Sequence, residues 1–300
     1  MTISEDFYAS YKEAQKKLGA EKFPIEQGII KKIHAPIEEV SKKYEQQRKG
    51  LMCSVLDKGY VRMAPHWVMG LGDLDISNDA RVSFMSESLI LNEKDKKLIK
   101  FLGSHKHTSC FRGVSVKMEV SAPLMFARQW WKYIIGSQHI EELQSDEYAK
   151  YQDHFSNWNE SSRRYIRDKL EFHIPQRLYS SPENRKQGSG EQLSLEQSKE
   201  IRLALDLHYE QCAERYFKAI ESGLCVEQAR LFLPAYGLYV KWVWTCSLQT
   251  LCHFISQRIN AGSQKGIQEY AKAVYILTRH LFEHGMEELL SPEAKELLKR

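Results

Sequence analysis

The pattern of hydrophobic and polar residues changes at about residue 52. Before that point, residues 1–50 carry widely spaced apolar positions among many charges, which predicts a polar helical extension. From residue 52 the run CSVLDKGYVRMA alternates and contains a Lys-Gly turn, which predicts two short strands. Residues 93–104, EKDKKLIKFLGS, return to helical spacing.

The clearest strand pattern is GVSVKMEVSA at residues 113–122. Its period of two predicts a half-buried strand, with polar side chains on one face and four apolar ones on the other. The four apolar positions are Val114, Val116, Met118 and Val120. Pro123 suits the first turn of a following helix, and PLMFARQWWKYII is apolar almost all round, which predicts a buried helix.

The second half of the chain reads mainly as helix and loop. Residues 138–156 are polar and charged and predict an exposed helical insertion, whereas residues 180–191 are rich in Ser, Gly and Pro and predict a loop. Ser194 and Gln197 have capping-box spacing, which predicts the start of a long helix. Gly223 supplies its stop.

After Leu233-Pro234, residues 238–260 and 265–286 are predicted to form two more helices. The expected fold class is therefore α+β. The expected organisation is a helical N-terminal extension over residues 1–51 and one main domain over residues 52–300.

Composition fits an ordinary soluble globular protein. The chain has 300 residues, of which 42% are hydrophobic and 27% charged. Its apolar runs are too short to span a membrane, and the polar N-terminus lacks the apolar core of a secretion signal, so the cytoplasm is the expected location. A net charge of +4 is too small to indicate a nucleic-acid binder and suits an enzyme whose positive charge is local.

The six cysteines are scattered, and no pair has CxxC spacing. This spacing argues against a zinc site or a redox dithiol, so no metal is expected. In a cytosolic chain the cysteines are predicted to be reduced thiols, several of them in the core.

Two segments place charge where burial is expected. One is Arg128–Lys132 inside the apolar helix; the other is Asn157–Tyr165, which combines an amide, a carboxylate, hydroxyls and two guanidiniums. Guanidinium groups grip phosphate with paired hydrogen bonds, and serine hydroxyls complete such a cradle. The alternative is a surface cluster of salt bridges.

Two further arginines, Arg230 and Arg258, lie in apolar sequence. A cation beside so much apolar surface needs a partner or an anionic ligand. The alternative is that each is a helix-terminal arginine whose charged end reaches solvent.

WNESSRRY resembles the centre of the signature RHRxxSxNExSxRY of the flavin-dependent thymidylate synthases (ThyX). The similarity covers roughly residues 52–285, and the extension and the insertion fall outside the usual pattern. Further similar blocks occur in the order of the family: LDKGYV, ARVSF, HKHTSCF, GVSVKMEVSAP, ARQWW, EFHIP, ARLFLP, LYVKWVWTCSLQTLCHFISQR and IQEYAKA.

The resemblance implies a ThyX-like α+β fold, with a central antiparallel sheet and long helices. It also implies conversion of dUMP to dTMP with FAD, NADPH and methylenetetrahydrofolate, in a homotetramer with active sites at subunit interfaces. No nucleic acid or membrane partner is implied. The family uses no cysteine nucleophile, and Cys252 and His253, as neighbours on a helix, are expected to point in different directions.

The nucleotide-binding residues of the family can be carried over from its motifs. They match Gln129, Trp130, Trp131, Lys132, Glu160, Ser161, Ser162, Arg163, Arg164, Arg230 and Arg258. Arg258 matches the arginine that polarises the uracil, and a fixed cation there would stabilise negative charge that develops on the ring.

The flavin-binding positions depart from the family pattern. They correspond to Ser83, Ser109, Lys132, Tyr133, Ile134, Glu160, Ser247, Gln249 and His253. The RHR motif reads Lys132-Tyr133-Ile134, the Asn-x-Arg pair reads Ser247-Leu248-Gln249, and a family glutamate is Arg112. Each lost donor would weaken FAD binding by about 1–3 kcal/mol unless new contacts replace it.

Three functions therefore stay open. The first is a divergent flavin-dependent thymidylate synthase, a methyltransferase. The second is a ThyX-like enzyme that modifies C5 of another pyrimidine nucleotide, which the intact nucleotide positions beside altered flavin positions favour. The third is a nucleotide-binding homologue that has lost flavin chemistry.

Overall fold

The computed structural model describes residues 51–63, 68–69, 72–133, 157–162, 170–182 and 188–299. The chain divides into two units, Met1–Arg48 and Lys49–Arg300, and every described residue lies in the second. The predicted helical extension and the predicted insertion at 138–156 lie outside the described residues.

An antiparallel sheet forms the centre of the second unit. Its strands follow the order β1 (Leu51–Val55), β2 (Gly59–Met63), β4 (Ser115–Pro123), β6 (Tyr239–Ser247) and β5 (Asn157–Glu160), and β3 (Val68–Met69) also pairs with β4. The predicted hairpin at the start of this unit is confirmed, since β1 and β2 pair antiparallel. The sheet confirms the α+β fold class.

The long strands β4 and β6 pair over nine residues each, in register from Ser115–Ser247 to Pro123–Tyr239. The predicted apolar face is confirmed: Val116, Met118 and Val120 of β4, and Val114 just before it, are at most 1% exposed. Pro123 ends this strand, and the helix begins one residue later.

The prediction of one helix over residues 238–260 is wrong. This stretch forms β6 and then α11 (Leu248–Arg258). The strand is rich in aromatic and β-branched residues, and Trp242, Trp244 and Cys246 are buried at a period of two. Pairing on both sides, with β4 and β5, satisfies its backbone as a central strand.

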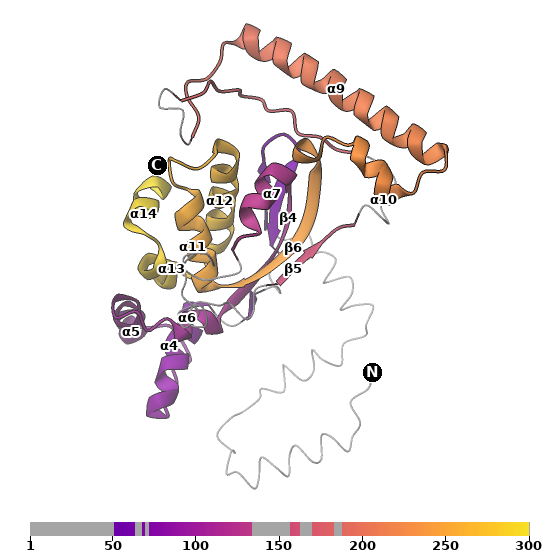
Figure 1. Ribbon diagram of the computed structural model, residues 1–300. Helices are drawn as coiled ribbons and strands as arrows, with labels where there is room; N and C mark the ends of the chain where they lie inside the picture. The colour runs from indigo at the N-terminus through magenta and orange to yellow at the C-terminus, as the bar shows by residue number, and fades with distance from the viewer. Residues whose placement is uncertain are drawn as a thin grey trace, which may run out of the picture. The chain divides into compact units, whose positions relative to one another are not determined.

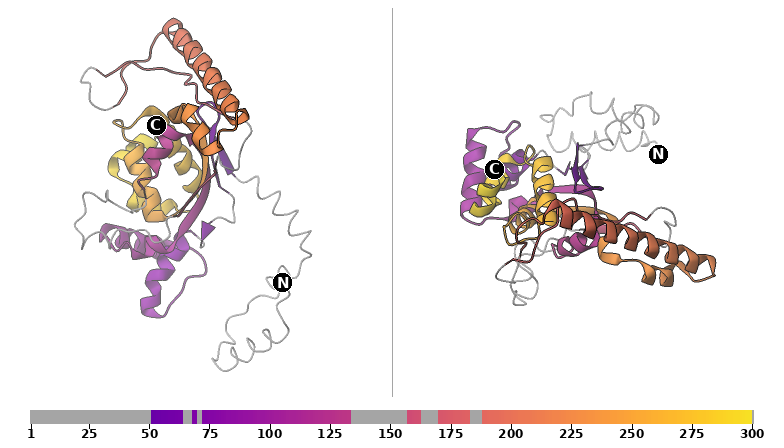
Figure 2. Two further views of the ribbon diagram at one scale, coloured as in Figure 1. Left: turned by 45° about the vertical axis from the view of Figure 1, so that its right-hand side comes forward. Right: turned by 90° about the horizontal axis from the view of Figure 1, so that it is seen from above.

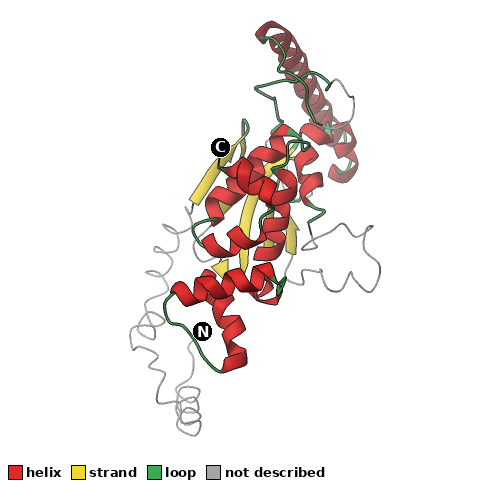
Figure 3. Cartoon of the chain, turned by 90° about the vertical axis from the view of Figure 1, so that its left-hand side faces the viewer, coloured by secondary structure: helices red, strands yellow, loops and turns green. Residues whose placement is uncertain are grey.

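Helices cover one face of the sheet. Figure 1 shows α7 (Leu124–Trp130), α11 and α12 (Lys265–Thr278) over the strands, with α13 (Glu283–Leu289) and α14 (Pro292–Leu298) beyond them. In Figure 3, helices lie in front of the strands. The predicted helix 265–286 thus ends earlier than expected, at Thr278.

Aromatic rings fill the space between these helices and the sheet. The Trp130 ring stacks on Phe254 at 4.3 Å between centroids and meets Trp242 and Trp244 edge-on, at 5.4 Å each. All four side chains are at most 1% exposed. Such contacts are worth more than the area they bury, so this cluster anchors α7 and α11 to the sheet.

A second group of helices precedes β4. It consists of α4 (Asp73–Arg81), the 3₁₀ helix η2 (Val82–Phe84), α5 (Glu93–Ser104) and α6 (Ser109–Gly113). The prediction of a helix at residues 93–104 is confirmed, and Asn92 and Asp95 close its first turn as a capping box.

The long helix α9 (Leu195–Glu221) begins and ends as predicted. Ser194 accepts from the Gln197 backbone N–H in a capping box, and Gly223 follows the helix with φ of +94°. Figure 2 shows α9 beside α10 (Val226–Ala229), which leads into the 3₁₀ helices η4 (Arg230–Phe232) and η5 (Ala235–Gly237). A second small core joins them, containing Phe172, Tyr209, Tyr216, Ala229, Leu233 and Leu238.

All six cysteines are free, and four of them are buried, as predicted. Burial raises the pKa of the Cys252 thiol, which argues against a nucleophile there.

In the described parts of the chain, no helix is long and apolar enough to cross a membrane. Those parts also contain no cluster of His, Cys, Asp or Glu residues that could hold a metal.

Candidate functional site

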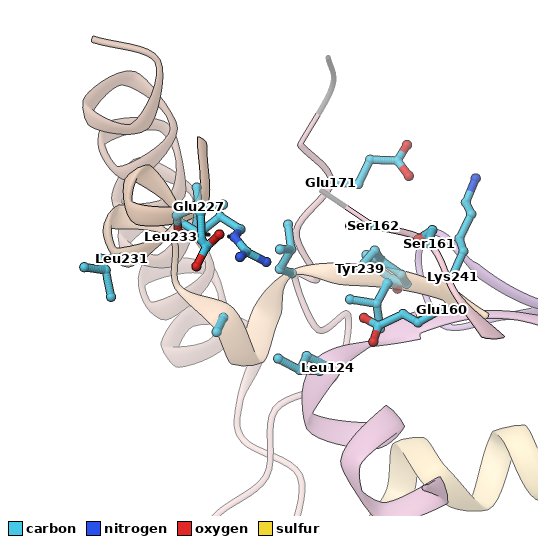
Figure 4. Close-up of a pocket in the computed structure, with 14 residues that line it drawn as sticks. Leu124, Glu160, Ser161, Ser162, Glu171, Glu227, Leu231, Leu233, Tyr239 and Lys241 are labelled. Carbon is cyan, nitrogen blue, oxygen red and sulfur yellow. Dashed lines mark hydrogen bonds between the residues drawn. The ribbon is translucent and has the colours of Figure 1, made fainter. Parts of the chain in front are cut away.

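A cavity of about 780 Å³ lies where β6 begins and β5 ends. Figure 4 shows side chains from both strands and from the segment after α9 around it. The lining consists of Leu124, Glu160, Ser161, Ser162, Glu171, Glu227, Arg230, Leu231, Leu233, Ala235, Leu238, Tyr239, Val240 and Lys241.

Strand pairing brings the predicted signature block to this cavity. Glu160 pairs with Trp242, and the Ser161 backbone N–H donates to the Lys241 carbonyl at 2.8 Å. Glu160, Ser161 and Ser162 therefore lie along the edge of β6, and all three line the cavity. Arg163 and Arg164, which follow directly in the sequence, lie outside the described residues.

Arg230 reaches the same cavity from a distant part of the chain. It begins η4, immediately after α10, and its Nε–H donates to the Glu227 carbonyl at 3.4 Å. Partial burial raises the pKa of the Glu160 carboxyl, and the Arg230 guanidinium opposes that rise. The two predicted residues thus interact electrostatically within one site.

The cavity carries charges of both signs. Its ionisable carboxyls are Glu160, Glu171 and Glu227, and its cations are Arg230 and Lys241. These side chains can hydrogen-bond a sugar hydroxyl or a base edge and can pair with a phosphate. Leucine and tyrosine side chains complete the wall, as is usual for a small-molecule site.

The predicted nucleotide residues of the ARQWWK segment lie at the end of α7, away from the lining of this cavity. The Gln129 side chain donates to Gln264 at 2.7 Å, Trp131 packs edge-on against Trp158, and Lys132 is exposed. Trp130 is 0% exposed and packs within the aromatic core, and the nucleotide contact proposed for it stays a prediction.

Arg258 lies in a separate environment at the last residue of α11. Its guanidinium carbon is 5.1 Å from the ring centroid of Tyr133, and its Nε has no hydrogen-bond partner in the described parts of the chain. Burial raises the pKa of Tyr133 to about 12, although Arg258 opposes the rise. Within one chain, Arg258 is not among the residues that line the 780 Å³ cavity.

The predicted flavin positions are distributed over several elements. Ser83 in η2 and Ser109 in α6 are exposed, whereas Tyr133 is buried, with its ring 5.5 Å from that of His253. Glu160 lines the cavity, and Ile134 lies outside the described residues.

Two predicted flavin positions lie at the start of α11. Ser247 is 0% exposed, and its hydroxyl accepts from the Thr250 backbone N–H as the helix cap, so it has a structural role, and its flavin contact stays a prediction. The Gln249 Oε1 atom is buried without a partner among the described residues. A buried acceptor without a partner fits a polar cofactor that brings its own N–H groups.

Sequence reasoning missed several residues at the cavity. Lys241, Tyr239 and Glu171 belong to blocks that were recognised, but no role was predicted for them. The alternation in YVKWVWTCS was the available signal, because it indicates a strand. The pairing of that strand with β5, which the sequence does not report, brings Lys241 next to Ser161.

Asp57 anchors Tyr239 from the hairpin turn between β1 and β2. Its Oδ1 atom accepts from the Tyr239 hydroxyl at 2.6 Å and from His173 Nδ1 at 2.5 Å, and its Oδ2 atom accepts from the Ile174 backbone N–H at 3.2 Å. Burial alone would raise the pKa of Asp57, but these bonds and the charge of His173 lower it to about 2.

This shift predicts a pH-dependent stability. The Asp57 pKa is about 2 in the folded chain, against an ordinary value of 3.8, so its contribution is complete above pH 3.8 and is lost as the pH falls toward 2. We expect Asp57→Asn to lower the unfolding free energy by about 2 kcal/mol near neutral pH, with a smaller difference at pH ~2. Urea unfolding at a series of pH values measures this, and a difference that does not change with pH would contradict it.

Comparison with known proteins finds a matching family, similar sequences and similar structures. The profile of a family described as "Thymidylate synthase complementing protein" matches residues 69–282. A flavin-dependent thymidylate synthase of Thermosipho melanesiensis is 32% identical over 220 residues, which cover 72% of this chain and 84% of that protein. An enzyme of the same name from Thermus thermophilus is 34% identical over 225 residues, covering 75% of this chain and 73% of that protein.

Solved structures with a similar fold include a UMP/dUMP methylase, PolB from Streptomyces cacaoi. The structure bound with 5-Br dUMP has a TM-score of 0.60 and 23% identity, and covers 79% of this chain and 96% of that chain. The structure bound with 5-Br UMP has a TM-score of 0.59 and 22% identity, covering 80% and 99%. At these identities the likeness concerns the fold.

Proposed function

Since this chain belongs to the family of flavin-dependent thymidylate synthases, we propose that it methylates dUMP to dTMP, with FAD as cofactor and NADPH and methylenetetrahydrofolate as co-substrates. The main structural support is one observation. Glu160, Ser161 and Ser162 of the signature block line the same cavity as Arg230, which belongs to a distant part of the sequence.

In this proposal each part of the cavity has a task. Arg230 and the Ser161 and Ser162 hydroxyls bind the phosphate of dUMP, since a guanidinium with hydroxyl donors suits a phosphate dianion. Arg163 and Arg164 add further cations. Glu160 orients the nucleotide by accepting hydrogen bonds, and Arg258 holds positive charge beside the uracil ring, where negative charge develops as C5 becomes nucleophilic.

FAD, when bound, supplies the reducing chemistry of the reaction. Ser83, Ser109 and Lys132 are exposed polar side chains that can bind its phosphates and hydroxyls. Gln249 Oε1, buried without a partner among the described residues, can accept from a ring N–H. The Tyr133 ring lies next to Arg258, and the His253 ring lies next to Tyr133. We propose these six residues as the cofactor set of this chain.

We also propose that the chain assembles as a homotetramer with active sites at subunit interfaces. Glu160 and Arg230 line the cavity, whereas Arg258 and Tyr133 lie outside its lining in the same chain. A second copy that placed the end of its α11 against this cavity would bring its Arg258 and Tyr133 next to Glu160 and Arg230.

The cytoplasmic location stays a prediction from the sequence.

The proposed function is tested with the purified full-length chain. We expect flavin absorbance, either as purified or after addition of FAD, and formation of dTMP from dUMP with NADPH and methylenetetrahydrofolate under anaerobic conditions. Arg230→Ala is expected to raise the KM for dUMP at least tenfold, because a charged hydrogen bond to phosphate is lost. Absence of both flavin binding and turnover would refute the proposal.

The second candidate, modification of another pyrimidine nucleotide, is supported by the altered positions at Lys132–Ile134 and Ser247–Gln249. The similar PolB structures are described as binding 5-Br UMP as well as 5-Br dUMP. Product masses from dUMP, UMP and dCMP, each assayed separately, distinguish the two candidates. Formation of dTMP from dUMP alone would exclude the second.

A further inference from the structure

We propose that Asp57 and His173 are positioning residues of the nucleotide site. In this proposal they hold the side of the cavity that Tyr239 lines in place for dUMP. This inference rests on the proposed function, because it takes the cavity at Glu160 and Arg230 to be the place where dUMP binds. Neither residue lines the cavity, so both act through the residues that do.

The Asp57 carboxylate joins three parts of the chain. The hairpin turn between β1 and β2 carries it, and His173 and Tyr239 lie 116 and 182 residues further along. Its two oxygens accept the three hydrogen bonds described above, from one imidazole, one phenol and one backbone amide. Such sharing by an ionised carboxylate forms strong bonds and fixes the direction of each donor.

The same hairpin turn also contacts the segment that contains Phe172 and His173, through Lys58. The Lys58 ammonium donates to the Phe172 carbonyl at 2.8 Å and lies 3.9 Å from Asp57 Oδ2. His173 is 7% exposed and Tyr239 is 5% exposed, so the hydrogen bonds of Asp57 are largely shielded from water. Buried bonds of this kind are costly to break, since the groups left behind stay unsatisfied.

These contacts reach the cavity through three of its lining residues. The Tyr239 backbone N–H donates to the Glu171 carbonyl at 2.8 Å, and Phe172 forms a bridge with Leu238. Tyr239, Leu238 and Glu171 all line the cavity. Loss of the Asp57 network would therefore remove the bonds that hold His173 and Ile174 next to Glu171 and the bond that orients the Tyr239 side chain.

The geometry suits a positioning role, in which small displacements of the wall alter substrate affinity. The Tyr239 hydroxyl donates to Asp57, which is not a residue of the cavity lining, so its orientation is set before a nucleotide arrives. The expected consequence is a change in dUMP affinity rather than loss of the chemical step.

Three variants test the role of the network. Asp57→Asn removes the charge, and His173→Leu removes the imidazole donor while keeping a bulky apolar side chain. His173→Asn is the conservative variant, because its amide N–H lies close to the position of Nδ1 and can donate to Asp57. Asp73→Asn is the matched control: Asp73 is 5% exposed and accepts from the His284 and Gly285 backbone N–H groups, and it is not a residue of the cavity lining.

The measurements are the Kd for dUMP by calorimetry, KM and kcat, and the thermal midpoint of each variant. We expect Asp57→Asn and His173→Leu to raise the Kd and KM at least fivefold with kcat within twofold of wild type. His173→Asn should restore most of the affinity, and Asp73→Asn should lower the thermal midpoint without altering the Kd.

The other outcomes overturn the inference in distinguishable ways. Wild-type affinity in Asp57→Asn and His173→Leu refutes the positioning role. An equal loss of affinity in all four variants assigns the effect to general destabilisation and also refutes it. A wild-type chain that binds no dUMP refutes the proposed function and, with it, this assignment.

Discussion

Arg258→Ala is expected to abolish dUMP methylation while the chain stays folded. Arg258 lies at the last residue of α11 and has a buried Nε without a hydrogen-bond partner in the described parts of the chain. Its guanidinium carbon lies 5.1 Å from the ring centroid of Tyr133, and the unpartnered Nε leaves one donor for a ligand. Removal of a preorganised cation from a reacting centre costs roughly 100- to 1,000-fold in rate, so we expect kcat/KM to fall at least 100-fold.

Single-turnover and steady-state assays of dTMP formation measure this effect, and far-ultraviolet circular dichroism reports the fold. Arg279→Ala is a matched control, because Arg279 also lies over a tyrosine ring, with its guanidinium carbon 5.9 Å from the centroid of Tyr275. Its turnover should equal that of wild type. Retained turnover in Arg258→Ala would mean that the catalytic role belongs to another residue.

Trp130→Ala is expected to cause the largest loss of stability. The indole is fully buried and contacts Phe254, Trp242, Trp244 and Tyr270. Truncation of such a side chain removes its transfer free energy and leaves a cavity between α7, α11 and the sheet. The expected loss in unfolding free energy is about 3–5 kcal/mol, measured by chemical denaturation.

Trp130→Phe separates packing from a specific nucleotide contact. It keeps most of the aromatic volume, so we expect a smaller loss of stability than for alanine and a Kd for dUMP close to that of wild type. A Trp130→Phe chain of wild-type stability that fails to bind dUMP would instead support the prediction of Trp130 as a binding residue.

Local signals in the sequence predicted much of the fold. The alternation in GVSVKMEVSA, the capping box of Ser194 and Gln197, and Gly223 after α9 each have a short-range physical cause. Such causes operate within a few residues and are visible in one sequence. The α+β class and the hairpin at the start of the second unit followed from the same kind of pattern.

The sequence pattern did not predict β6 because the strand and the helix after it have similar composition. It runs without a break into α11, and both are rich in large apolar residues, so one continuous helix was a reasonable interpretation. The boundary is Ser247, whose hydroxyl caps α11. A serine within an apolar run is a weak signal, and the pairing with β4 that decides the matter is not visible in the sequence.

The candidate site also contains some residues that the sequence predicted and other features that it could not predict. Glu160 and Arg230 carried enough motif context to be predicted, and both line one cavity. The separation of Arg258 from that cavity, the burial of Trp130 and the network around Asp57 depend on tertiary packing. The bond between Asp57 and His173 spans 116 residues, and no periodicity in a single sequence reports a contact at that distance.

The nine-residue register between β4 and β6 also governs where this chain tolerates changes in length. Deleting or inserting one residue within β6 would exchange the two faces of the strand, so that Trp242 would point outward and Lys241 inward. Length variation among homologues is therefore expected in the connections between elements and not within these two strands. A tag or reporter domain inserted for engineering should likewise be placed in a connection.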